Sequence, residues 1–204
     1  MHQDAIRQVQ AILRAQFSGL SEKEILQLPK KLRNPLKYRF RSLLFVAEGA
    51  RHRVKGFALL MYAPDLHFCY LDFIAADPKN VGGGIGGALY QRVRDEARQL
   101  NCLGVFFECL PDDPQLCRDP AILKQNKARL RFYERYGARP IINTAYETPL
   151  SPVDDCPPYL VYDAIGCTEP LGRDTARAIV RAILERKYGD KCPPDYIDMV
   201  VASF

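Results

Sequence analysis

The segment that most constrains the fold is DPKNVGGGIGGALYQRVRDEA, residues 77–97, in which five of the six positions 82–87 are glycine. Glycine costs about 0.5–1 kcal/mol relative to alanine within regular structure. Here the glycines directly precede the apolar periodicity of a helix. Backbone N–H groups without side chains at a helix N-terminus form a site for phosphate oxygens. The segment therefore predicts an anion-binding turn, with a flexible hinge or tight helix packing as the structural alternative.

Two common phosphate-binding turns do not fit this segment. A P-loop ends in Gly-Lys-Ser/Thr, whereas Ala88 and Leu89 follow the glycines here. The dinucleotide fingerprint GxGxxG can be placed on residues 82–87, and Glu108 lies roughly where its ribose-binding acid belongs. However, that fingerprint follows its strand almost at once, and DPKN intervenes in this chain. Neither turn is favoured.

The rest of the chain alternates between helical and strand patterns. Apolar spacing predicts helices at 4–17, 88–100 and 120–136 and from Asp174 to near Gly189, and a capping box, Ser21 with Glu24, begins a short helix ending by Pro29. Strands are predicted at 42–48, 54–62, 66–76, 102–110, 139–147 and 159–166. The first three strands are almost continuously apolar, so we expect their sheet to be covered on both faces.

Composition and charge bound the class of protein. The 204 residues contain no apolar run near the ~20 residues that a membrane helix needs. The N-terminus lacks the apolar stretch of a signal peptide, and a soluble cytoplasmic protein is expected. The seven cysteines form no CxxC pair, which favours reduced thiols and argues against a metal site. The basic run at 30–41 is interpreted as a solvated connector, with binding of phosphates or acidic partners as the alternative.

Two motifs resemble those of the GNAT superfamily of acyl-CoA-dependent N-acyltransferases. YLDFIAADPKNVGGGIGGALY resembles its motif A, an apolar strand ending in Ile-Ala-Val-Asp-Pro and then Arg/Gln-x-x-Gly-x-Gly/Ala. Val81 stands where Arg or Gln is usual. NKARLRFYERYGA resembles the second signature, with Asn126 followed seven residues later by Tyr133. The resemblance covers about residues 40–166.

The resemblance implies an α/β (α+β) fold with a mixed, mostly antiparallel sheet. That sheet would be splayed between two parallel strands, flanked by helices and followed by an extra C-terminal helix. We expect an acetyltransferase domain at 1–166 and a helical extension of unknown role at 167–204. The apolar end of the chain suggests that the sequence is the front part of a longer protein or that this end packs against a neighbouring molecule. A homodimer is left open.

The implied reaction is direct transfer of an acetyl group from acetyl-CoA to a primary amine. By resemblance, Tyr133 is the acid that protonates the departing thiolate. Glu108 and Asp72 are the two candidate bases, with structural ion pairing as the alternative for both. Burial of Glu108 among apolar neighbours is expected to raise its pKa into a useful range. The residues that the resemblance places on the cofactor are Ile74, Ala75, Ala76, Val81, Gly82, Gly83, Gly84, Ile85, Gly86, Gly87, Asn126 and Tyr133.

The acceptor is not encoded in these motifs. Two loops carry Asp112, Asp113, Asp119, Asp154 and Asp155, and their charge favours a small cationic amine or a lysine or N-terminal amine of a protein. The alternative function is a non-catalytic, acyl-CoA-binding regulatory module. Nucleic-acid binding through residues 30–41 is the least favoured of the hypotheses.

Overall fold

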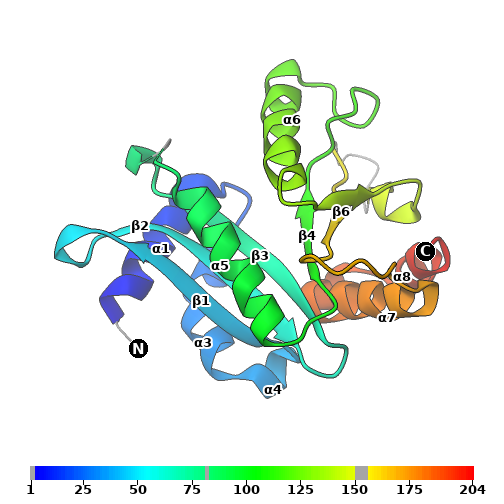
Figure 1. Cartoon of the computed structure of the whole chain (residues 1–204), viewed down its shortest axis with the longest axis horizontal. Helices are drawn as coiled ribbons and strands as arrows, with labels where there is room; N and C mark the ends of the chain where they lie inside the picture. Colours follow the sequence, from blue (N-terminus) through cyan, green and yellow to red (C-terminus); the bar gives the residue numbers. More distant parts are fainter. Residues whose placement is uncertain (1–2, 81–82, 150–155) are drawn as a thin grey trace. The chain divides into compact units, whose positions relative to one another are not determined.

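Figure 1 shows a computed structural model of the chain, which describes residues 3–80, 83–149 and 156–204. The chain forms two units, Met1–Asn101 and Cys102–Phe204. The first unit contains an antiparallel meander of β1 (Arg41–Glu48), β2 (Val54–Ala63) and β3 (Phe68–Ala76). The first two predicted strands, 42–48 and 54–62, correspond to β1 and β2 and pair as a hairpin.

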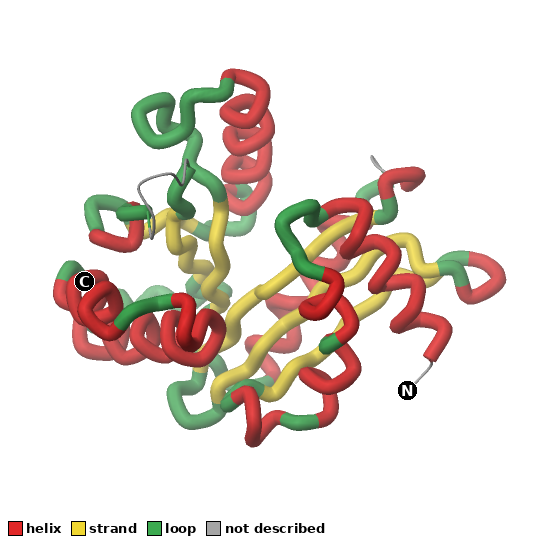
Figure 2. Tube along the Cα trace, turned by 180° about the vertical axis from the view of Figure 1, so that it is seen from behind, coloured by secondary structure: helices red, strands yellow, loops and turns green. Residues whose placement is uncertain are grey.

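Helices cover both faces of this meander, as the apolar strands predict (Figures 1 and 2). Helix α5 (Ile85–Gln99) lies on one face, and α1 (Gln3–Gln16) lies on the other. The core includes Val9 and Leu13 of α1, packed with Phe57 of β2. Helix α5 follows β3 after a short segment that includes the first of the glycines.

The N-terminal helices differ from the prediction after Pro29. The capping box is confirmed, because Ser21 and Glu24 exchange hydrogen bonds at the start of α2 (Glu22–Leu26). Pro29 does not end the helical region, since it lies in the first turn of α3 (Leu28–Arg33), where proline is tolerated. Together with α4 (Pro35–Tyr38), α3 folds most of the expected connector into short helices.

The second unit contains three antiparallel strands in the order β4, β6, β5. These are β4 (Val105–Cys109), β6 (Tyr159–Asp163) and β5 (Arg139–Ile141). The predicted strand at 139–147 is wrong beyond Ile141, because a capping box of Thr144 and Glu147 closes a 3-10 turn there. Helix α6 (Pro120–Glu134) begins at the cap Asp119, and the chain turns at Gly137, whose φ is +93°.

The C-terminal segment is helical but contains more elements than predicted. Helix α7 (Arg173–Ile183) continues into a wider turn of π type at Leu184–Tyr188 and a 3-10 turn at Gly189–Lys191. The helix was predicted to begin at Asp174, and it begins one residue earlier, with Gly172 in the cap position. Helix α8 (Pro194–Ala202) was not predicted, and it buries Ile197, Val200 and Val201.

These elements confirm a mixed α/β fold with mostly antiparallel strands and flanking helices. The predicted splay between two parallel strands concerns the relation between the units and stays a prediction. The domain boundary predicted at residue 166 also stays a prediction, although α7 and α8 belong to the second unit with β4–β6.

One disulfide corrects the prediction that all seven cysteines are reduced. Cys117 and Cys156 are bonded, with their Cα atoms 4.6 Å apart and a sequence separation of 39. A pair so far apart in the chain has no spacing signature, which is why the sequence did not indicate it. The bond ties the segment leading to α6 to the segment leading to β6.

Candidate active site

The glycine segment forms the N-terminus of α5, as predicted. Gly84 occupies the cap position in the left-handed region with φ +71°, and no side chain caps the helix there. The first intrahelical bond runs from Ala88 N to Gly84 O at 3.0 Å, so the amides of residues 85–87 belong to the orphan set of a helix start. A Cβ added at Gly84 or Gly86 would meet no atom within 4 Å. Tight packing therefore does not explain these two glycines. Val81 and Gly82, which were also predicted to bind the cofactor, lie outside the described residues.

The strand that leads to this turn carries a β-bulge at Asp72. Leu59 of β2 pairs with Phe73 and Leu60 pairs with Leu71, which leaves Asp72 as the extra residue of β3. Ile74, Ala75 and Ala76 follow the bulge at the end of β3, half-buried and paired with β2. Bulges redirect side chains and interrupt pairing near functional sites. The main chain expected to hold the acyl group thus lies between a bulge and the glycine turn.

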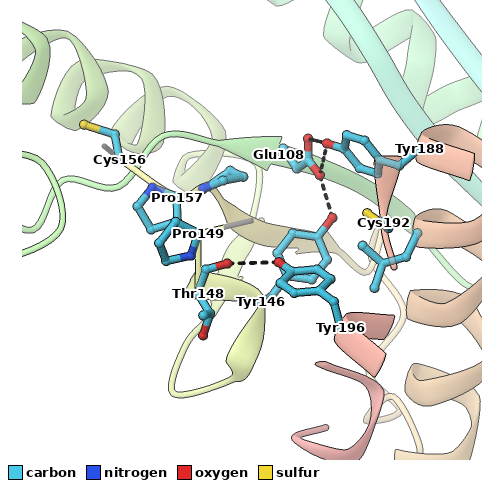
Figure 3. Close-up of a pocket in the computed structure, with 11 residues that line it drawn as sticks. Glu108, Tyr146, Thr148, Pro149, Cys156, Pro157, Tyr188, Cys192 and Tyr196 are labelled. Carbon is cyan, nitrogen blue, oxygen red and sulfur yellow. Dashed lines mark hydrogen bonds between the residues drawn. The ribbon is translucent and has the colours of Figure 1, made fainter. Parts of the chain in front are cut away.

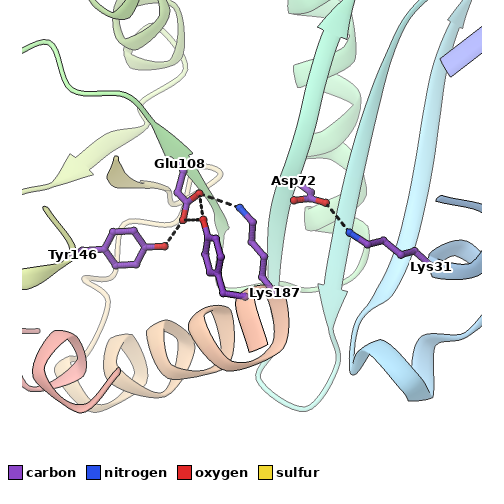
Figure 4. A network of polar contacts seen from close by, with 6 residues as sticks. Lys31, Asp72, Glu108, Tyr146 and Lys187 are labelled. Carbon is purple, nitrogen blue, oxygen red and sulfur yellow. Dashed lines mark hydrogen bonds and ion pairs between the residues drawn. The ribbon is translucent and has the colours of Figure 1, made fainter. Parts of the chain in front are cut away.

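Asp72 is the first candidate base, and its side chain is 2% exposed. Its Oδ2 lies 3.7 Å from Nζ of Lys31, a residue of α3 (Figure 4). Lys31 comes from the basic run at 30–41, so part of that run serves an internal ion pair. This contact agrees with the structural alternative for Asp72.

Glu108 is the second candidate base, and three side chains from the C-terminal half of the chain surround it (Figure 4). Its carboxylate accepts hydrogen bonds from the hydroxyls of Tyr146, at 2.5 Å, and Tyr188, at 2.7 and 2.6 Å. Nζ of Lys187 donates to the same carboxylate at 3.0 Å. The Glu108 side chain is 16% exposed, so most of its charge is screened by these partners rather than by water.

The expectation that the pKa of Glu108 lies above its ordinary value is wrong. Burial does act in that direction and is the largest influence on the group. The positive charge of Lys187 and the hydrogen bonds from Tyr146 and Tyr188 together outweigh it, so the pKa of Glu108 lies below its ordinary value. Glu108 is therefore ionised at neutral pH and can accept a proton, although it is a weak base.

Tyr133 lies on α6 and is buried, with 6% of its surface exposed. Its ring centroid lies 4.4 Å from that of Phe107, the neighbour of Glu108 on β4. Burial raises the pKa of Tyr133, and Cys109 adds to the shift while Arg129 opposes it. A phenol that stays protonated at neutral pH meets the first requirement of a proton donor, but the same burial fits a core tyrosine, and the role stays a prediction.

Asn126 has a clear structural contact. Its side chain is buried, and Nδ2 donates to Pro111 O at 2.8 Å. The bond holds α6 against the loop that follows β4. This contact is structural, and the cofactor binding expected of Asn126 stays a prediction.

A pocket of about 260 Å³ lies beside Glu108 within the second unit (Figure 3). Its other lining residues are Tyr146, Thr148, Pro149, Cys156, Pro157, Pro158, Leu184, Tyr188, Cys192 and Tyr196. Sequence reasoning missed this pocket and the partners of Glu108. Lys187 and Tyr188 are 79 and 80 residues away from Glu108 in the sequence. The apolar face of residues 176–184 predicted that this segment packs against another part of the chain, but not that it brings Lys187 and Tyr188 to Glu108.

Asp112 and Asp113 lie close enough to Tyr159 that their charges, with that of Glu147, add to burial in raising the pKa of its hydroxyl. Asp119 caps α6 by accepting from the amides of Ala121 and Ile122, and Asp113 accepts from Gln115 N at 2.8 Å. Asp154 and Asp155 lie outside the described residues. In the described part of the chain, no group of three or more His, Cys, Asp or Glu side chains could hold a metal ion.

A family model for the acetyltransferase (GNAT) family matches residues 6–138. The chain belongs to the GNAT family. The match ends within the second unit, just after α6, so GNAT sequence features account for the glycine turn and Tyr133 but not for α7 and α8. No curated protein matches the chain.

Solved structures show the same fold at low sequence identity. An aminoglycoside 6'-N-acetyltransferase complexed with coenzyme A is 12% identical, with a TM-score of 0.59, over 81% of this chain and 92% of that one. The ribosomal-protein-S18-alanine N-acetyltransferase of Escherichia coli is 17% identical, with a TM-score of 0.55, over 79% and 88%. Ard1 of Thermoplasma volcanium is 22% identical, with a TM-score of 0.53, over 78% and 90%.

No helix among residues 3–80, 83–149 and 156–204 combines the length and hydrophobicity of a membrane-spanning segment.

Proposed function

We propose that this GNAT protein transfers an acetyl group from acetyl-CoA to a primary amine, and that the start of α5 binds the diphosphate of coenzyme A. The observation that carries the proposal is the open space around Gly84 and Gly86. A helix start with free amides and no Cβ in the way favours phosphate oxygens through both hydrogen bonds and the helix dipole. The family match over this segment supports the same assignment.

In the proposed reaction, the neutral amine nitrogen attacks the carbonyl carbon of the thioester. A C–N bond forms and the C–S bond breaks, so the products are an amide and free CoA. The proton lost by the amine passes to the Glu108 carboxylate, directly or through water, and the thiolate takes the proton of the Tyr133 hydroxyl. The main chain of residues 74–76 positions the acetyl group.

The experiment that tests the proposal is the variant Gly86→Ala. Because a Cβ at Gly86 has room within the protein, alanine should keep or raise the stability, by up to about 1 kcal/mol for a helix position. The same methyl group would lie in the phosphate site, so calorimetry should show a lower affinity for acetyl-CoA, by about tenfold. Gly19→Ala is the matched control, since it also has open space and lies outside α5.

The proposal fails if acetyl-CoA does not bind the unmodified protein, or if NAD or ATP binds in its place. It also fails if Gly86→Ala and Gly19→Ala bind acetyl-CoA equally well.

A non-catalytic acyl-CoA sensor is the second candidate function. One observation favours it: three side chains already occupy the Glu108 carboxylate, as expected for a group that holds the fold together. Turnover separates the two functions. Release of CoA thiol in the presence of an amine panel supports the enzyme, and binding of acetyl-CoA without turnover for any amine supports the sensor.

A further inference from the structure

The pocket beside Glu108 has an unusual balance of charge for an amine site. Glu108 is the one acidic residue among its described lining residues, and Lys187 already neutralises that carboxylate. The other polar side chains are uncharged at neutral pH: burial raises the pKa of Tyr196 to about 12 and raises that of Cys192. A substrate with several positive groups would find no second carboxylate in the lining that the structure describes.

The remaining surface of the pocket is aromatic and apolar. Tyr146, Tyr188 and Tyr196 contribute rings, and Figure 3 shows the first and last of these side by side below the carboxylate. Three prolines and a leucine complete the apolar part of the lining, at Pro149, Pro157, Pro158 and Leu184. Burial of apolar surface contributes about 25 cal/mol per Å², so a ring or short hydrocarbon gains most from this site.

The pocket is small, so it accommodates only the part of an acceptor next to the amine or a compact acceptor as a whole. Its volume of about 260 Å³ lies below the range of about 300–1,000 Å³ that holds drug-sized ligands. One ring with a short chain fits this volume, whereas an oligosaccharide or a folded peptide would extend outside it.

Every described lining residue except Glu108 comes from beyond the family match. Leu184, Tyr188, Cys192 and Tyr196 belong to the C-terminal segment 184–196, and the family model ends at residue 138. The hydroxyl of Tyr196 donates to Thr148 O at 2.9 Å, which holds this ring against the opposite wall. The segment therefore forms a fixed wall of the pocket rather than a separate appendage.

We propose that this pocket binds the acceptor and that segment 184–196 selects a single primary amine carried on a compact aromatic or apolar group. The inference rests on the proposed function, because it places the acceptor nitrogen at Glu108. It assigns to the C-terminal segment the role of substrate selection, and it replaces the cationic acceptor that the acidic loops suggested with an amine of one positive charge.

The test compares 2-phenylethylamine, spermidine and a lysine-containing peptide as acceptors for the full chain. We expect kcat/KM to be highest for 2-phenylethylamine. Tyr196→Ala should raise its KM by about tenfold, because the ring that closes the pocket is lost, while kcat changes little. Met199→Ala, on the same helix but 44% exposed, is the matched control and should keep the KM of the wild type.

A measurement on the unmodified protein guards against misfolding of the variant. Titration with 2-phenylethylamine, followed by NMR of isotope-labelled tyrosine, should shift resonances of the pocket rings and leave that of Tyr38, on α4, unchanged. Preference for spermidine or the peptide, equal KM values for the two variants, or unshifted pocket resonances would overturn the inference alone. Failure to bind acetyl-CoA, or to turn over with any amine, would instead overturn the proposed function and the acceptor role with it.

Discussion

Asp72 and Glu108 occupy similar positions in the two halves of the chain. Each lies on a strand, each carries a carboxylate that is mostly buried, and each is paired with a lysine from a helical segment. The two ion pairs differ in length. Lys31 lies 3.7 Å from Asp72, whereas Glu108 receives a hydrogen bond of 3.0 Å from Lys187 and further hydrogen bonds from the hydroxyls of two tyrosines.

The difference teaches how to separate a structural carboxylate from a candidate catalytic one. Burial and a lysine partner are common to both, so neither property identifies a site. Glu108 lines the pocket of the second unit, and its hydrogen bonds fix its position toward that pocket. Access for a substrate, combined with a fixed geometry, favours Glu108 as the base.

The largest expected effect comes from neutralising each carboxylate in turn. Glu108→Gln keeps the shape of the side chain but removes the proton acceptor, so kcat should fall about 10²–10⁴-fold. Asp72→Asn should leave kcat close to the wild-type value and lower the stability by on the order of 1 kcal/mol, because Lys31 stays partly exposed. Steady-state kinetics with the best acceptor and chemical denaturation of both variants provide the measurement.

A large loss of kcat in Asp72→Asn, with Glu108→Gln fully active, would reverse the assignment. If both variants keep the wild-type kcat, neither carboxylate is the base, and the comparison between them describes structure alone.

A smaller effect is expected when the lysine partners are removed. Lys187 lowers the pKa of Glu108, and burial raises it. Lys187→Met removes the largest influence that lowers this pKa, so the pKa of Glu108 should rise. Because the ionised form is the base, the acid limb of the pH profile of kcat/KM should move to higher pH.

Lys31→Met is the control for this pH shift, since it removes the corresponding partner of Asp72. Its acid limb should coincide with that of the wild type, and Lys187→Arg should restore the limb by returning the charge. An acid limb that stays in place in Lys187→Met would show that Glu108 does not control the reaction.

The two halves also differ in how far the sequence predicts them. In the first unit the glycine turn, the capping box at Ser21 and the three strands could be predicted, because each depends on contacts between residues close in the chain. The register of β2 against β3, and hence the bulge at Asp72, depends on pairing between strands and has no local signal.

In the second unit the candidate site itself escaped prediction. Tyr133 and Glu108 could be named as candidates, but Lys187 approaches Glu108 only when α7 docks its apolar face. The sign of the Glu108 pKa shift was wrong for the same reason: burial can be guessed from apolar neighbours in the strand, whereas compensating partners come from distant segments.

The smallest change in turnover is expected at the disulfide, which supports the Glu108 pocket and has no counterpart beside Asp72. Cys156 lines the pocket, and its amide also donates to Leu116 O at 3.1 Å, so the backbone is held there by more than the sulfur bond. In Cys156→Ser the free energy of unfolding should fall by about 2–4 kcal/mol, while the acceptor KM rises only a few-fold.

Cys167→Ser, at an exposed thiol outside the disulfide, is the control. Because the chain contains no tryptophan, circular dichroism in urea is the measurement, with reduced wild-type protein as a third sample that should match Cys156→Ser. Equal stability of the two serine variants would mean that the wall of the pocket is held by packing and hydrogen bonds alone.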